Sequence, residues 1–193
     1  MTDLHYQCKR VQLIGISGKL GSGKTTLCHY IREKAPQFEK KSFAENLRRI
    51  VSILVNVDVE ATRSMSDKNV RLEKWGLSIG ELLQLVGTEV VRSIHPDAWI
   101  LSLFEYHDEQ TSYWILDDVR FKNEADAIRS HGGILIRLNG DPGECVHLLS
   151  QSRNTNHSSE VALDDYEHFD VVINTDDYRG NIEGLFDSLF LVK

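Results

Sequence analysis

The chain has 193 residues, of which 41% are hydrophobic, and its formal net charge at pH 7 is −7. This length suits a single domain, residues 1–193, with one substantial core. We expect no polymeric nucleic acid as a partner, because phosphate contacts of that kind need clustered Lys and Arg. The three cysteines form no C-x-x-C pair, which favours a reducing compartment and argues against a disulfide framework.

Apolar stretches in the chain are short. No run approaches the roughly 18 apolar residues of a membrane span, and residues 1–9 lack an apolar segment of signal-peptide length. We therefore expect no membrane partner and a cytoplasmic location, which is the host cytoplasm if the source is viral.

The first predicted element is a strand at residues 10–16, followed by a segment that matches G-x-x-x-x-G-K-[ST], the signature of a phosphate-binding P-loop. This segment consists of Gly18, Lys19, Leu20, Gly21, Ser22, Gly23, Lys24 and Thr25, with Thr26 after it. Glycines let backbone N–H groups converge on an anion, and a helix predicted from Lys24 to Lys34 adds its N-terminal dipole. We expect the whole segment to bind ATP, with Lys24 at the β- and γ-phosphates and Thr25 on Mg²⁺.

The next part of the chain is predicted to be mainly helical. After a short strand at residues 38–43, a helix is expected at 43–51 and a polar loop with short helical turns at 56–70. A longer helix is predicted at 79–93, and another starts near Pro96.

Ser78 is expected to cap the helix at 79–93, because Glu81 stands three residues further on, as in a capping box. The predicted buried stripe of this helix consists of Leu82, Leu85, Val86 and Val90.

A short apolar strand is predicted at residues 112–116, and it ends in Asp117 and Asp118. Ligands bind at the carboxyl ends of strands in open α/β sheets, so one of these carboxylates is expected near the metal or the phosphates. Arg120 follows closely and could reach a transferring phosphoryl group. The alternative for Arg120 is a salt bridge to Glu124 at helical spacing.

The remaining predicted elements alternate between helix and strand. A helix at 122–130 precedes strands at 134–138 and 169–173, and an amphipathic helix at 182–191 ends the chain. Residues from about 140 to 166 are polar and suit a lid-like flap that carries Arg153 and His157.

This alternation predicts a doubly wound α/β fold with right-handed crossovers. Its mostly parallel, five-stranded sheet would carry helices on both faces, which gives three layers. We expect the helical region, about residues 43–110, to bind the phosphoryl acceptor.

Two classes of nucleotide-binding protein fit poorly. A guanine-specific N-K-x-D run is missing, because residues 174–177 read Asn-Thr-Asp-Asp. A chain of 193 residues also leaves little room for the arms of a motor or transporter ATPase. A small-molecule kinase remains.

Several segments, in order and over most of the chain, resemble the phage-type deoxynucleoside monophosphate kinases, a P-loop family. They are residues 15–26, 43–44 with 47–48, 83–89 with 92, 97–99, 118–121 with 123–125, 132–133 and 157–160. The Asp-Val-Arg-Phe and His-x-Ser-Glu segments are more specific than the P-loop. The resemblance implies transfer of the γ-phosphate of ATP, with Mg²⁺, to a deoxynucleoside monophosphate.

The resemblance also implies site roles. Asp118 would lie near the metal, and Arg120 would lie near the transferred phosphoryl and the acceptor, with Arg153 catalytic in the lid. The acceptor pocket would be lined by Phe43, Arg48, Gly87, Thr88, Arg92 and Trp99. The two aromatic residues are more readily explained as core than as stacking platforms. The segment 144–165 carries one arginine, Arg153, where kinase lids often present several, which raises the weight on Lys19, Lys24 and Arg120.

Three alternatives stay open. Animal-type phosphomevalonate kinases have a similar P-loop, Asp-x-Arg element and Ser-Glu stretch, and a nucleotide-binding module without catalysis is a candidate from another class. Residues 182–191 could pack on the chain's own sheet or on a second copy, so a homodimer is also a candidate. The accepted base is open as well.

Overall fold

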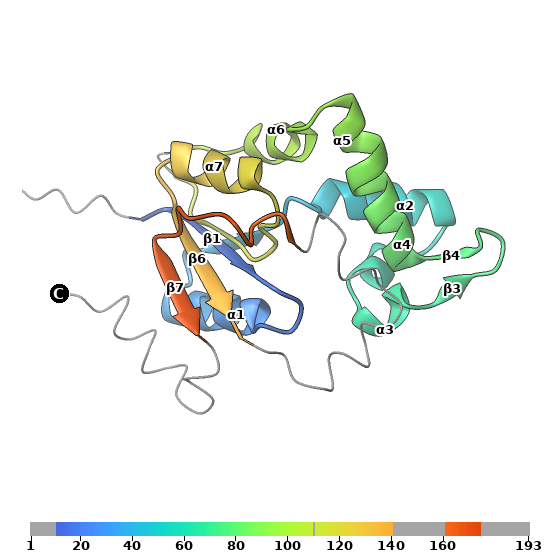
Figure 1. Cartoon of the computed structure of the whole chain (residues 1–193), viewed down its shortest axis with the longest axis horizontal. Helices are drawn as coiled ribbons and strands as arrows, with labels where there is room; N and C mark the ends of the chain where they lie inside the picture. The colour runs from blue at the N-terminus through green and yellow to red at the C-terminus, as the bar shows by residue number, and fades with distance from the viewer. Residues whose placement is uncertain (1–10, 110, 141–160, 175–193) are drawn as a thin grey trace, which may run out of the picture.

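The computed structural model describes residues 11–109, 111–140 and 161–174 (Figure 1). The predicted terminal helix at 182–191 and most of the predicted flap, with Arg153 and His157, lie outside the described residues. None of the helices within the described ranges is both long and apolar enough to cross a membrane.

A five-stranded sheet forms the centre of the fold, with strand order β2-β5-β1-β6-β7. The strands are β1 (Leu13–Gly18), β2 (Glu39–Lys41), β5 (Trp114–Leu116), β6 (Ile134–Asn139) and β7 (Val171–Asn174). Every adjacent pair is parallel. β1 and β5 are therefore neighbours, and the P-loop and the aspartate pair follow them at the same edge of the sheet.

Helices cover both faces of this sheet (Figure 1). On one face α1 (Lys24–Lys34) packs Leu27 and Ile31 in one core cluster with Ile14 and Ile16 of β1. On the other face α7 (Lys122–Ser130) packs Ile128 in a second cluster with Leu13 and Leu135. The result is the predicted three-layer α/β architecture of P-loop NTPases.

A helical region lies between β2 and β5 in sequence. It consists of α2 (Glu45–Val55), η1 (Val59–Thr62), α3 (Met65–Lys68), α4 (Ile79–Gln84), η2 (Leu85–Val90), α5 (Val91–Ile94) and α6 (Ala98–Phe104). The short turns expected at 56–70 are confirmed by η1 and α3. The capping box between Ser78 and Glu81 is also confirmed, with the Glu81 backbone N–H 3.2 Å from Ser78 Oγ.

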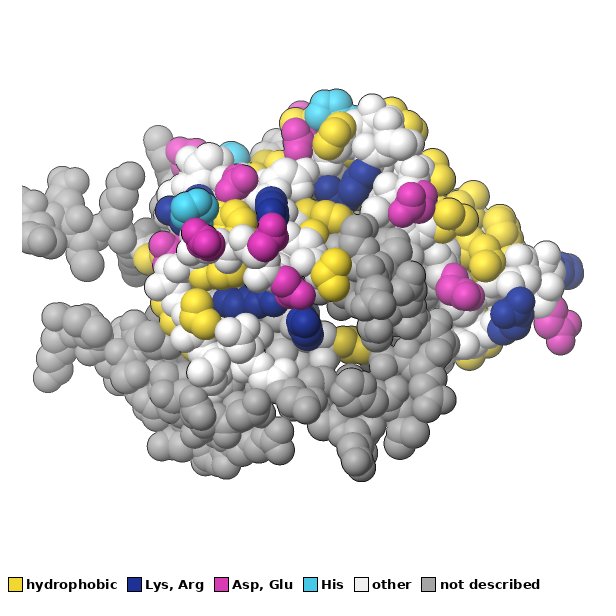
Figure 2. All heavy atoms as spheres, in the orientation of Figure 1, with side chains coloured by type: hydrophobic (Ala, Val, Ile, Leu, Met, Phe, Trp, Pro, Cys, Tyr) yellow, Lys and Arg dark blue, Asp and Glu magenta, His cyan; other side chains and the backbone are white. Residues whose placement is uncertain are grey.

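The helix predicted at 79–93 is not one regular α-helix. Its middle, η2, is a π-helical turn. The predicted buried stripe is wrong at Leu85 and Val90, the first and last residues of this turn, which are 44% and 47% exposed. A π-helical turn departs from the 3.6-residue period on which that prediction rested. Hydrophobic side chains accordingly gather on the surface of the helical region at the right of Figure 2.

Two further features depart from the sequence prediction. Helix α2 starts at Glu45, because Ser42–Ala44 form a turn that Asp118 holds. The helix continues to Val55, beyond its predicted end. A small antiparallel hairpin, β3 (Arg71–Leu72) and β4 (Leu77–Ser78), was not predicted. Strands of two residues are too short to show alternation of polar and apolar side chains.

Candidate active site

The P-loop connects the end of β1 to the start of α1. Gly18, Gly21 and Gly23 all have positive φ, at 158°, 80° and 92°. A Cβ atom at Gly18 would lie 2.4 Å from Ser22 Oγ, so this loop needs glycine there. Lys24 folds back over the loop, and its Nζ donates to the carbonyl oxygens of Gly18 and Lys19 at 2.7 and 2.6 Å.

Thr25, on the first turn of α1, faces Asp117 at the end of β5. The Thr25 hydroxyl donates to Asp117 Oδ2 over 3.2 Å, and Lys40 Nζ of β2 donates to the same oxygen at 2.6 Å. Asp117 is 9% exposed. The aspartate beside the predicted metal ligand Thr25 is therefore Asp117, although the resemblance had implied Asp118.

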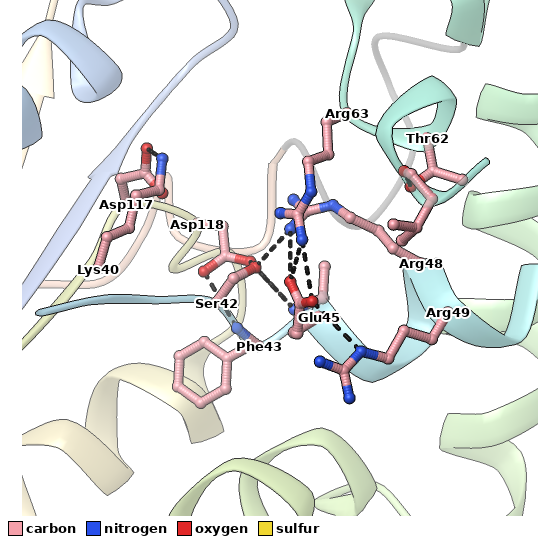
Figure 3. A network of polar contacts seen from close by, with 12 residues as sticks. Lys40, Ser42, Phe43, Glu45, Arg48, Arg49, Thr62, Arg63, Asp117 and Asp118 are labelled. Atoms are coloured by element: carbon pink, nitrogen blue, oxygen red, sulfur yellow. Dashed lines mark hydrogen bonds and ion pairs between the residues drawn. The ribbon is translucent and has the colours of Figure 1, made fainter. Parts of the chain in front are cut away.

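Asp118 points to the other side, toward the start of α2 (Figure 3). Its carboxylate accepts hydrogen bonds from the Ser42 hydroxyl at 2.6 Å and from the backbone N–H groups of Phe43 and Ala44 at 3.2 and 3.1 Å. Arg48 donates to Ser42 Oγ at 2.8 Å. Asp118 thus joins the end of β5 to the start of α2 and, through Ser42, to Arg48.

An ion-pair network supports the first turn of α2 (Figure 3). Glu45 pairs with Arg63, directly after η1, at 2.7 Å and with Arg49 at 3.4 Å. Burial would raise the pKa of Glu45, but the hydrogen bond and charge of Arg63, with Arg48 and Arg49 beside it, hold that pKa below its ordinary value. The network fixes the helix that presents Arg48.

One cavity brings together every predicted acceptor-binding residue, although these residues lie far apart in the sequence. It is lined by Phe43, Arg48, Gly87, Thr88, Arg92, Trp99 and Arg120 of the prediction, and also by Asp118, Phe121 and Glu124. Phe43 and Trp99 are buried as well, at 4% and 6% exposure, so both serve the core as expected.

The π-helical turn supplies one wall of this cavity. The Trp99 indole N–H donates to the carbonyl oxygen of Gly87 at 2.9 Å. A Cβ atom at Gly87 would lie 2.6 Å from Leu47 Cδ2, so glycine lets the turn approach α2 closely. Sequence periodicity could not have placed these contacts, because an extra residue in one turn leaves no local signal.

Glu124 of α7 is the main residue at the cavity that sequence reasoning did not assign to the site. It is 3% exposed, pairs with Arg92, and accepts the backbone N–H groups of Arg120 and Phe121 at 2.8 and 3.1 Å. Burial raises its pKa to about 7 against the opposing charge of Arg92. The helical spacing in the sequence had suggested Arg120 as the ion-pair partner of Glu124, and the pair with Arg92 was not predicted.

Comparison with known proteins identifies the family. No protein-family model matches the chain. A protein of Acanthamoeba polyphaga mimivirus, named "Putative deoxynucleotide monophosphate kinase", is 30% identical over 177 residues, which cover 83% of this chain and 86% of that protein. The chain belongs to the deoxynucleotide monophosphate kinase family.

Two solved kinase structures also match this chain, at low sequence identity. A shikimate kinase from Bacteroides thetaiotaomicron has 14% identity and a TM-score of 0.49, covering 93% of this chain and 98% of that one. A sugar kinase from a Janibacter species has 17% identity and a TM-score of 0.43, covering 86% and 87%.

Near the P-loop lies a further cluster of charged residues, which come from β6 and from the segment before β7. Asp164 pairs with Lys19 at 3.3 Å and with Arg137 at 2.8 Å, and Arg137 also donates to the Ser17 hydroxyl at 3.0 Å. Asp164 therefore joins the end of the predicted flap to the loop. These contacts of Asp164 were not predicted, because no residue spacing in the sequence marks an acidic residue of the flap as a partner of the P-loop.

Proposed function

We propose that the chain transfers the γ-phosphoryl group of ATP to the phosphate of a deoxynucleoside monophosphate. The observation that carries this proposal is the placement of the acceptor cavity beside the P-loop. Asp118 borders the cavity, and the adjacent Asp117 contacts Thr25 of the P-loop. Family membership independently supports the same reaction.

On the donor side, the residues fit a magnesium-bound triphosphate. Lys24 lies over a loop of positive-φ glycines, and the oxygen atoms of Thr25 and Asp117 lie 3.2 Å apart beside it. When bound, Mg²⁺ would neutralise charge on the phosphates. We assign Thr25 and Asp117 to this ion in place of Asp118. Within the described ranges, no group of three or more His, Cys, Asp or Glu side chains could hold a metal, which suits an ion completed by phosphates and water.

On the acceptor side, three arginines line the cavity, Arg48, Arg92 and Arg120. The acceptor phosphate is already an anionic nucleophile, so no strong general base is required. Repulsion between two phosphates is the main obstacle, and guanidinium groups reduce it while fixing the acceptor in line. Arg120 follows Asp117 and Asp118 most closely and is the proposed cation at the transferred group.

The division of labour along the chain is part of the proposal. Residues of about 43–110 would bind the acceptor, and residues of about 140–166 would form a lid that brings Arg153 to the phosphates and excludes water. We also propose a cytoplasmic enzyme, in the host cytoplasm if the source is viral.

The test is an ADP-release assay with Mg²⁺ and ATP against the four deoxynucleoside monophosphates, the matching ribonucleotides and phosphomevalonate. Turnover of at least one deoxynucleotide supports the proposal and identifies the base. Activity on phosphomevalonate alone would move the chain to that reaction. No turnover with any acceptor would favour a binding module, and the Lys24→Met variant serves as the blank.

A further inference from the structure

Glu124 is a buried carboxylate that the proposed reaction does not itself use. It lies at the start of α7, where its side chain reaches back to the turn after β5. An ionised carboxylate at 3% exposure is costly unless its oxygens accept hydrogen bonds or face a cation. The contacts of Glu124 therefore indicate its role in the structure.

The two carboxylate oxygens have separate partners. Oε2 accepts the backbone N–H groups of Arg120 and Phe121, at 2.8 and 3.1 Å. Oε1 accepts a hydrogen bond from Arg92 Nη2. One oxygen thus shapes the turn that carries Arg120, and the other orients a guanidinium from α5.

Arg92 is held from three sides. Besides Glu124, its Nη1 donates to the Pro96 carbonyl at 3.0 Å, and its guanidinium lies 3.8 Å above the Phe121 ring centroid. A long, flexible side chain loses much conformational freedom when it binds a ligand, and such prior contacts reduce that loss. Two of its five N–H donors are engaged in this way, and the guanidinium still lines the cavity.

We propose that Glu124 is a positioning residue that fixes the Arg92 guanidinium and the Arg120 backbone for binding of the acceptor phosphate. Its own negative charge would repel that phosphate, so it acts through the two arginines. The inference rests on the proposed function and adds a determinant of acceptor affinity.

Glu124→Gln separates the two tasks of the carboxylate. A glutamine oxygen can still accept the backbone N–H groups, but its NH₂ group then faces the Arg92 donor. We expect the acceptor KM to rise about tenfold, on the scale of one lost charge-assisted hydrogen bond, while the KM for ATP stays within about twofold. The exposed Glu33 of α1 supplies the matched control, and Glu33→Gln should change neither constant.

A double-mutant cycle distinguishes positioning from a general loss of structure. In an Arg92→Met background, Glu124→Gln should raise the acceptor KM by less than about twofold, because the residue it orients is gone. An equal, additive increase in both backgrounds would overturn the proposal, as would an unchanged acceptor KM in the single variant. A lower melting temperature with unchanged KM values would assign Glu124 to stability alone. These outcomes are read in an active enzyme, so they are distinct from failure of the wild-type chain to turn over any acceptor.

Discussion

The two sides of the β5 terminus are built in different ways. On the donor side, a continuous segment of the chain supplies Lys24 and Thr25, and Asp117 at the end of β5 contacts Thr25. On the acceptor side, arginines from α2, α5 and the turn after β5 line one cavity. Arg48 is linked to Asp118 through Ser42, and Arg92 pairs with the buried Glu124. A phosphate cradle can be encoded locally, whereas this acceptor cavity depends on tertiary contacts.

The two sides meet at Asp117 and Asp118, which are neighbours in sequence and face opposite sides. Successive side chains leaving a strand alternate in direction. Asp117 therefore meets Thr25, and Asp118 meets the start of α2. One peptide unit separates the proposed donor side from the proposed acceptor side.

The largest predicted effect tests the donor side. Replacing Lys24 with Met should lower kcat by at least about a hundredfold, the scale on which loss of a preorganised charge affects a transition state. The measurement is steady-state ADP release at saturating acceptor. Lys34→Met, at the exposed end of the same helix, should retain wild-type turnover, and near-normal turnover of Lys24→Met would reject the P-loop mechanism.

The donor side could be predicted from sequence because its constraints are local. Positive φ requires glycine at Gly21 and Gly23, and the following lysine and threonine complete the phosphate-binding signature directly after a predicted strand. Buried parallel strands and their alternation with helices likewise predicted the sheet. The predicted bounds of α1 and α7 agree with the structure, since the P-loop marks the start of α1 and the glycines at 132–133 mark the end of α7.

The acceptor side could be predicted only as a set of residues implied by resemblance. The cavity brings that set together, but its binding role is still a prediction. The carboxylates behind it were not predicted in these roles, because the resemblance implied that Asp118 lies near the metal and Glu124 was considered only as a salt-bridge partner of Arg120. The π-helical turn at Gly87 also leaves the apolar spacing ambiguous.

A pH effect of intermediate size should distinguish the two sides. Burial, with the nearby charge of Asp118, raises the pKa of Glu124 to about 7, although Arg92 and two backbone N–H groups oppose this. Above that pH the ionised carboxylate holds Arg92, and as the pH falls through 7 protonation releases it. The acceptor KM should therefore rise between pH 8 and pH 6, whereas the KM for ATP should follow only the titration of its own phosphates.

Glu124→Gln is the control for titration of the acceptor phosphate, which also occurs in this range. The expected tenfold gap between its acceptor KM and that of the wild type at pH 8 should close to about twofold at pH 6, because most Glu124 is then protonated. A gap that stays constant across this range would contradict the account.

The smallest predicted effect concerns the wall of the cavity. Trp99→Phe removes the hydrogen bond to the Gly87 carbonyl and leaves a small void, so the free energy of unfolding should fall by about 1–3 kcal/mol. The acceptor KM should rise only a few-fold. Urea denaturation measures the first effect, and an unchanged unfolding free energy would show that this bond does not hold the π-helical turn.

The most direct test of the two-sided account is a crossed titration of Asp117→Asn and Asp118→Asn. Initial rates would be measured against free Mg²⁺ at saturating acceptor, and against acceptor at saturating Mg²⁺. We predict that Asp117→Asn raises the Mg²⁺ concentration for half-maximal rate about tenfold, and that Asp118→Asn instead raises the acceptor KM about tenfold, each being the cost of one charged contact. The reverse pattern, with magnesium dependence altered by Asp118→Asn, would contradict the assignment.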